Sequence, residues 1–183
     1  MMKNKKDAFV KVFVFLKNGM GLNTHQIAGV MGNLHAESAI LPDNVYNGIY
    51  SGEHDYESGY VFDANDNIAF GLLQWANPAR KAGLEAMAET MALGSSKSDK
   101  TKAIWNINVQ LAYFKQEMTS TVNEVKDYSA VWKRIKNINN YNVVSDTFLK
   151  EIESPGNANS EIETRRRYSK MIYDELSKLE ESW

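Results

Sequence analysis

The spacing of apolar residues along the chain predicts a mainly helical protein. In most segments apolar side chains recur every three or four residues, which places them on one face of an α-helix. The predicted helices carry stripes at Phe9, Val10, Phe13 and Leu16; at Ile27, Val30, Met31 and Leu34; at Leu84, Met87, Ala88 and Met91; at Ile107, Leu111, Phe114, Met118, Val122 and Val125; at Val131, Trp132 and Ile135; between residues 143 and 152; and at Tyr168, Ile172, Leu176 and Leu179.

Capping residues and helix breakers delimit these stripes. Asparagine and serine side chains satisfy the free N–H groups of a first helical turn, and glycine or proline ends a helix. The predicted stops are Asn18-Gly19, Pro42, Gly94 and the stretch Ser154 to Asn157, and the predicted caps are Asn23 in a capping box with Gln26, Asn77 followed by Pro78, Ser129, and Ser160 in a capping box with Glu163.

Two segments lack the helical period. Residues 43–58 are rich in Gly, Asn, Tyr and acids and are too long for a simple connection, and segments of this kind commonly bind ligands. The stretch "GYVFDANDNIAFGLL" has two short apolar runs around the turn Ala64–Asn67, which predicts one small β-hairpin. We therefore expect a mainly α fold with one hairpin between early helices, in a single domain over residues 1–183.

The composition fits a globular protein and narrows the chemistry. Hydrophobic residues make up 43% and charged residues 24% of the chain, and there is no cysteine, which excludes disulfides and thiol nucleophiles. No apolar run is long enough to cross a bilayer. The basic, apolar N-terminus is interrupted by Asp7, Lys11 and Lys17, so we expect an amphipathic helix there and no signal peptide.

Charge is unevenly distributed, although the formal net charge is only -2. Residues 18–79 contain seven acids and no Lys or Arg, a balance that repels nucleic acid. Arg165–Arg167 could suggest a nucleic-acid patch, but Glu161 and Glu163 precede Arg165 and Arg167 by four residues. That spacing favours solvated ion pairs on a helix.

Glu37 is the first candidate for chemistry. It follows Leu34, Val30 and Ile27 by 3, 7 and 10 residues, so it continues the apolar face of its helix. Partial desolvation penalises a charged carboxylate, and a general acid needs to keep its proton at working pH. The alternative is a solvated glutamate at a helix end. On an adjoining face, Gly29, Gly32 and Ala36 leave room for backbone or a ligand to approach closely.

Four stretches carry a resemblance to a known family. Glu37-Ser38 followed by Pro42, and then Gly71–Gln74, resemble the paired signatures of the lysozyme-like superfamily, which includes goose-type lysozymes and lytic transglycosylases. The stretches "AGVMGNLHAES", "AFGLLQW", "FLKEIESPG" and "RRRYSKMIYDEL" together resemble the phage tail lysozyme family, from about residue 8 to residue 176. In place of the family's usual Glu-Arg-Pro, the chain has Glu153-Ser154-Pro155.

The resemblance implies a muramidase that cuts the β-1,4 bond between N-acetylmuramic acid and N-acetylglucosamine. It implies that Glu37 protonates the glycosidic oxygen and that Gln74 and Trp75 line the glycan cleft. It also implies a bacterial cell-wall substrate, a phage virion tail or extracellular setting, phage tail proteins as partners, and no cofactor. A lytic transglycosylase giving 1,6-anhydro products and a non-catalytic glycan-binding tail module remain alternatives.

A hydrolase of this kind commonly needs a second carboxylate. Asp63 and Asp66 flank the predicted hairpin turn and are preferred over Glu57 for that role. Aromatic rings can stack on sugars, and Phe70 and Tyr60 join the predicted cleft. The other tyrosines of the acidic segment either stack on saccharides or pack on one another: Tyr46, Tyr50 and Tyr56.

Metal chemistry is not expected. His25, His35 and His54 are the only imidazoles, and His35 and Glu37 fall on different helix faces. The Asp63, Asn65, Asn67 series lacks the glycine and the final acid of a calcium loop, so a turn explains it better.

Overall fold

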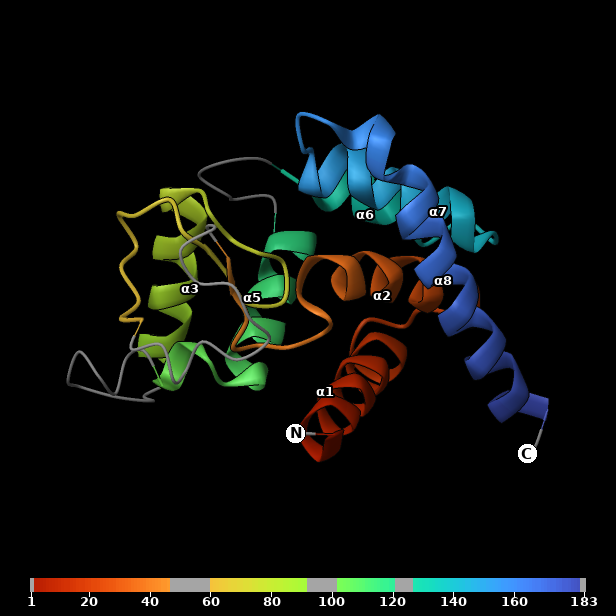
Figure 1. Cartoon of the computed structure of the whole chain (residues 1–183), viewed down its shortest axis with the longest axis horizontal. Coiled ribbons are helices and arrows are strands. Elements are labelled where there is room, and N and C mark those ends of the chain that lie inside the picture. Colours follow the sequence, from red (N-terminus) through yellow and green to blue (C-terminus); the bar gives the residue numbers. More distant parts are fainter. Residues whose placement is uncertain (1, 47–59, 92–101, 121–126, 182–183) are drawn as a thin grey trace. The chain divides into compact units, whose positions relative to one another are not determined.

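The structure is a computed structural model that describes residues 2–46, 60–91, 102–120 and 127–181. Helices dominate these ranges, as the apolar spacing predicts (Figure 1). The backbone forms two compact units: unit 1 contains residues 1–40 and 128–183, and unit 2 contains residues 41–127. Within the described ranges, none of the helices combines the length and the hydrophobicity that a membrane span requires.

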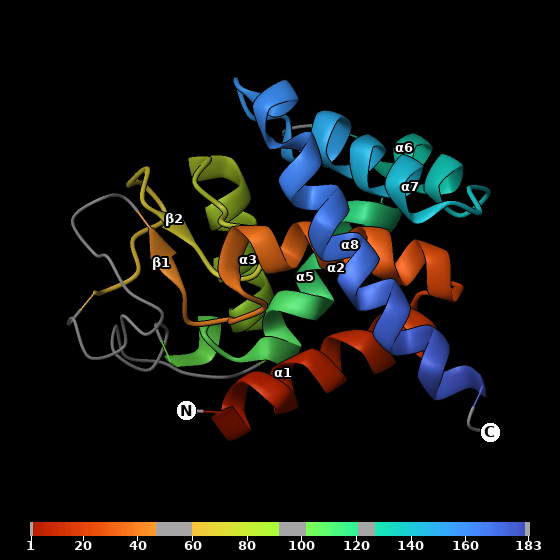
Figure 2. The ribbon, with the colours of Figure 1, turned by 45° about the vertical axis from the view of Figure 1, so that its right-hand side comes forward.

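Unit 1 is a helical assembly around one buried helix. Its elements are α1 (Met2–Val14), the π-helix η1 (Phe15–Gly19), α2 (Thr24–Ser38), α6 (Ser129–Ile135), α7 (Tyr141–Phe148), the π-helix η2 (Leu149–Glu153) and α8 (Ala158–Glu181). The helix α2 is buried over most of its length, and α8 runs across it (Figure 2).

The glycines of α2 permit close helix packing. A Cβ atom at Gly32 would lie 2.7 Å from the Ser169 backbone nitrogen of α8, and one at Gly29 would lie 2.8 Å from the Tyr141 carbonyl oxygen of α7. Both distances are shorter than a carbon atom tolerates, so only glycine fits. The predicted close approach to this face is therefore confirmed for backbone.

Unit 2 contains β1 (Val45–Tyr46), β2 (Ala69–Phe70), α3 (Pro78–Thr90) and α5 (Ile107–Thr119). The two strands pair antiparallel, with Val45 opposite Phe70. The predicted hairpin is wrong in its first strand, because residues 60–62 form no strand. Tyr60 and Phe62 instead pack their rings against Phe70, and the expected turn after Phe62 is present.

The predicted caps are only partly confirmed. Asn23 and Gln26 form both hydrogen bonds of the capping box, and Asn77 accepts from the N–H groups of Ala79 and Arg80. The prediction for Ser129 is wrong, because Tyr128 occupies the cap position. The prediction for Ser160 is also wrong, because α8 begins at Ala158.

Two helices end earlier in the structure than the sequence predicts. The helix α3 ends at Thr90, before Gly94, and α5 ends at Thr119, before Val122. The break at Ser154 is confirmed: this residue adopts a left-handed φ of 51° and ends η2. The loop at residues 94–100, the segment at 47–58 and the valines at 122 and 125 lie outside the described residues.

Candidate active site

Glu37 lies in the last turn of α2, in unit 1, and its surroundings begin with the residues of its own motif. The Ser38 hydroxyl is buried and donates to the Leu34 carbonyl oxygen, so Ser38 stabilises the helix end. Ala39 and Ile40 then adopt left-handed φ angles of 54° and 60°, which turns the chain away from the helix axis. The Glu37 side chain is 20% exposed and therefore stays accessible to solvent.

The side chain of Arg165 contacts Glu37. Arg165 is on α8, is 4% exposed, and its Nη2 atom donates to the Glu37 carboxylate. The same atom lies 2.6 Å from the Glu161 carboxylate, and Nη1 donates over 2.9 Å to the Asn33 carbonyl oxygen. One buried guanidinium thus fixes the position of the Glu37 carboxylate against the backbone of α2.

A further carboxyl group completes this site. Glu153, the last residue of η2, is 6% exposed and lies 3.5 Å from Arg165 Nη2. Glu37, Glu153, Glu161 and Arg165 are called the acid cluster below. The π-helical turn that carries Glu153 is a local irregularity of a kind frequent at functional sites.

The electrostatics of the acid cluster favour a retained proton. Burial raises the pKa of Glu153 well above its ordinary value, the charge of Glu37 raises it further, and Arg165 offsets only part of the shift. Three ionised carboxylates around one guanidinium would leave an excess of two negative charges in a poorly solvated place. A proton held by the buried carboxyl reduces that excess.

Asp66, in unit 2, has a different setting from the one predicted. Its carboxylate pairs with Lys81, whose side chain is fully buried, and accepts a hydrogen bond of 3.0 Å from the Tyr60 hydroxyl. Lys81 also donates to the Ile68 carbonyl oxygen over 3.2 Å. Burial and the charge of Asp66 raise the pKa of Tyr60, so its hydroxyl keeps its proton. This arrangement indicates a structural ion pair, because both carboxylate oxygens of Asp66 are already engaged, one by Lys81 and one by Tyr60.

Asp63 lies on the turn itself. It is exposed, and its Oδ1 atom accepts from the Asn65 backbone N–H over 2.9 Å, which is the bonding of an Asx turn. The alternative of a turn in place of a calcium loop is thereby supported. Among the described residues, no group of three or more His, Asp or Glu side chains is placed to hold a metal ion.

The Gly71–Gln74 motif is a tight turn built on two left-handed residues, Gly71 at φ 74° and Gln74 at φ 46°. A Cβ atom at Gly71 would lie 2.6 Å from the Gln110 side-chain oxygen, so glycine is required there. The Gln74 amide donates to the carbonyl oxygens of Gly71 and Asn44, over 2.9 and 3.2 Å. Gln74 is half-buried, and its amide nitrogen holds the turn against the residue before β1.

Three predicted sugar platforms are corrected by their burial. Trp75 is fully buried, and its indole N–H donates to Glu117 over 3.0 Å, beside the bidentate Arg80–Glu117 ion pair. Phe70 is also fully buried and Tyr60 is 5% exposed. Rings with so little exposed surface are poor platforms for a sugar, and these three residues are part of the core of unit 2.

The remaining predicted residues have simple surroundings or fall outside the described ranges. His25 stacks on Tyr173, and His35 lies against Tyr168, where burial and the charge of Lys5 lower the pKa of His35. Four predicted residues lie outside the residues that the structure describes: Tyr50, His54, Tyr56 and Glu57. For Tyr46 the structure describes only the backbone.

Arg165 and Glu153 are the site residues that sequence reasoning missed. The arginine run was interpreted as solvated, and Arg166 does pair with Asp146 at the surface. Arg165, however, precedes the buried Ile172 and Leu176 by 7 and 11 residues, so it belongs to the apolar stripe of α8. That register was the signal in the sequence for a buried arginine. Glu153 gave a weaker signal, as the acid of the altered Glu-Ser-Pro motif.

These features describe a mainly α protein in which an accessible glutamate in the last turn of α2 lies beside a buried arginine of α8 and a buried carboxyl of η2. The sequence matches the phage tail lysozyme family over residues 7–176 of 183, nearly the whole chain. The chain belongs to this family. Its family gives it a lysozyme-like, cell-wall-degrading function and a phage-associated setting. Searches of the curated proteins and of the solved structures each found no match.

Proposed function

We propose that this protein is a muramidase that hydrolyses the β-1,4 bond between N-acetylmuramic acid and N-acetylglucosamine, with Glu37 as the general acid. The proposal rests on one observation above all. In a chain of the phage tail lysozyme family, the glutamate of the expected motif ends α2 with an accessible carboxyl group held by a buried arginine. Peptidoglycan strands are the proposed substrate, and other tail proteins are the proposed partners.

The proposed reaction begins at the glycosidic oxygen. Glu37 gives its proton to that oxygen as the bond to the muramic acid C1 breaks, and the N-acetylglucosamine leaves with the new hydroxyl. A positive charge develops on the muramic acid ring, and a water molecule adds its oxygen to C1. The proton lost by this water is taken up by a carboxylate, which completes the balance.

The acid cluster supports this assignment in two ways. Glu153 is too buried to reach a substrate. Burial and the charge of Glu37 raise the pKa of Glu153, so the acid cluster keeps a proton on this buried carboxyl beside the proposed acid. Arg165 orients the Glu37 carboxyl and stabilises it after the proton has left. Both are proposed as positioning residues.

The second carboxylate is proposed among the acids predicted from sequence. Asp63 is exposed, whereas Asp66 is held by Lys81 and Tyr60. We therefore place Asp63 first for the activation of water. Gln74 is the half-buried member of the predicted sugar-binding set, whereas the other three residues are buried, so it stays a proposed substrate contact.

The substitution Glu37→Gln tests the acid directly. Glutamine keeps the size and the hydrogen bond to Arg165 but has no proton to give, so we expect lysis of purified cell walls to fall at least about a hundredfold with the fold retained. Glu163→Gln on the exposed face of α8 is the matched control and should lyse at the parent rate. A folded Glu37→Gln variant that lyses walls at the parent rate would exclude Glu37 as the acid.

A further inference from the structure

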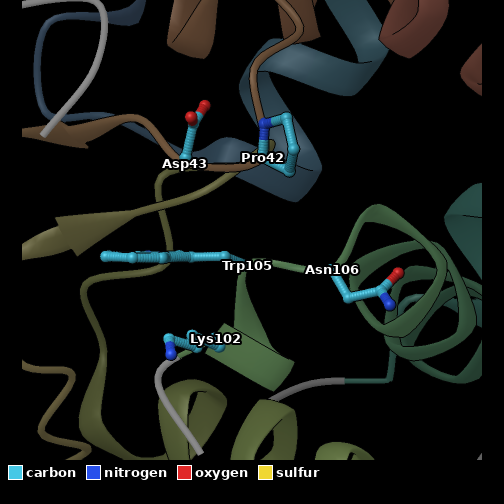
Figure 3. Close-up of a pocket in the computed structure, with 5 residues that line it drawn as sticks. All are labelled: Pro42, Asp43, Lys102, Trp105 and Asn106. Atoms are coloured by element: carbon cyan, nitrogen blue, oxygen red, sulfur yellow. The ribbon is translucent and has the colours of Figure 1, made fainter. Parts of the chain in front are cut away.

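Unit 2 contains a pocket that is lined by none of the site residues predicted from the sequence. Its volume is about 360 Å³, and it is lined by Pro42, Asp43, Lys102, Trp105 and Asn106. Pockets for small ligands span roughly 300 to 1,000 Å³, so this one has room for a ligand at the lower end of that range. Figure 3 shows the Trp105 ring edge-on, with Pro42 and Asp43 on one side and Lys102 on the other.

Trp105 differs from the other tryptophan of unit 2 in its exposure. Trp75 is fully buried, whereas Trp105 is half-buried and lines the pocket. The Phe70 ring lies nearly parallel to Trp105, with 6.3 Å between ring centroids and 14° between ring planes. The indole is therefore supported from the core while part of it stays accessible.

The walls of the pocket are tied together by one buried amide. Gln110 is fully buried, and its Nε2 atom donates to the Pro42 carbonyl oxygen over 2.6 Å and to the Ile104 carbonyl oxygen over 2.9 Å. Its Oε1 atom accepts from the Leu72 backbone N–H over 2.9 Å. The loop at Pro42, the residue before Trp105 and the Gly71–Gln74 turn are thus fixed to one side chain, which preorganises the pocket.

The backbone after Trp105 is fixed as well. Asn106 is the N-cap of α5, and its side-chain oxygen accepts from the Asn108 N–H over 2.9 Å. The amide nitrogen of Asn106 is still able to donate a hydrogen bond. Both chain neighbours of Trp105, Ile104 and Asn106, are therefore held by hydrogen bonds.

We infer that this pocket is a saccharide subsite in which a pyranose ring of the glycan packs against Trp105. A sugar ring has C–H faces that suit an indole and a hydroxyl rim that suits Asp43, Lys102 and the Asn106 amide. The carboxylate of Asp43 and the ammonium of Lys102 in the lining favour a ligand with hydroxyl groups over a purely apolar one. The identity of the sugar, an N-acetylhexosamine of peptidoglycan, rests on the proposed function.

Binding is measured in the Glu37→Gln background, so that no turnover interferes. The probe is a β-1,4-linked N-acetylglucosamine oligosaccharide, titrated by calorimetry and by tryptophan fluorescence. We expect Trp105→Ala to weaken binding about tenfold, Trp105→Phe to weaken it less, and Lys102→Ala at the exposed rim to weaken it about two- to threefold. The fluorescence change on binding should disappear in Trp105→Phe.

Two controls keep the result interpretable. Thermal unfolding establishes that each variant folds, and Lys17→Ala on the exposed face of η1 should bind like the parent. If folded Trp105 variants and Lys102→Ala bind with parental affinity, or if the Glu37→Gln protein does not bind the oligosaccharide, the inference is overturned. Loss of binding on removal of Trp105, in a protein whose parent releases no fragments from walls, would keep the subsite and reject the proposed hydrolysis.

Discussion

Arg165 is the residue on which the candidate site depends most. Its guanidinium touches Glu37, Glu153 and Glu161 and the backbone of Asn33, and it is buried while it does so. A buried cation of this kind costs desolvation, which only close carboxylates repay. The arrangement keeps an accessible acid in one position beside a carboxyl group that cannot reach solvent.

The Glu153 carboxyl predicts a pH dependence of stability. Its pKa is raised in the folded protein, so its contribution is fully present below the ordinary glutamate pKa of about 4.3 and is lost as pH rises through the folded value. Glu153→Gln cannot ionise and lacks this loss. The unfolding free energy of the parent should fall relative to the variant by about 1.4 kcal/mol per pH unit in that window.

Urea unfolding of both proteins from pH 4 to pH 8 measures this difference. Parallel curves over the whole range would show that Glu153 ionises as an ordinary glutamate.

Substitutions of Asp66 and Asp63 distinguish a structural role from a catalytic role for these two acids of unit 2. Asp66→Asn leaves the fully buried Lys81 ammonium without its carboxylate, so we expect a loss of about 3 kcal/mol of unfolding free energy. Asp63→Asn, on the same turn but exposed, should cost under about 0.5 kcal/mol. The measurements are the unfolding free energy of each variant in denaturant and its rate of wall lysis. An Asp66→Asn protein of parental stability and no lysis would assign catalysis to Asp66.

At the scale of helices, the contact between α2 and α8 brings Arg165 to Glu37. Ser169 of α8 lies against Gly32 of α2, and Arg165 is one turn earlier on α8. Gly32→Ala would force the two backbones apart, at a cost of about 2 kcal/mol, and would reduce lysis by moving Arg165. Gly156→Ala, where a Cβ meets no atom within 4 Å, is the control. Unchanged stability and lysis in Gly32→Ala would contradict this account of the packing.

The helices and strands also differ in how well they could be predicted from the sequence. Helices with strong local signals, such as the capping box at Asn23, were predicted correctly, because those hydrogen bonds join residues three apart. The hairpin was placed wrongly, because the partner of Phe70 is Val45, across a segment with no local pairing signal. Glu37 and Arg165 are 128 residues apart, and only packing joins them. Burial likewise separates Trp75 from Trp105, and local sequence alone does not predict which of the two indoles is accessible.

At the scale of the whole molecule, the family match extends over both compact units. Residues 7–176 include the acid cluster of unit 1 and the Gly71–Gln74 turn and Trp105 pocket of unit 2. The general acid is thus proposed in unit 1, and the water-activating Asp63 and the saccharide subsite at Trp105 are proposed in unit 2. The prediction of a single domain stays a prediction.

The most direct test of the central claim is mass spectrometry of the fragments released from purified peptidoglycan by the parent protein and by Glu37→Gln. We predict that the parent releases muropeptides with a reducing-end N-acetylmuramic acid and that Glu37→Gln releases almost none. A 1,6-anhydro product would instead establish transglycosylation. Fragments released equally by both proteins, or by neither while both bind the wall, would contradict the proposal that Glu37 is the acid of a muramidase.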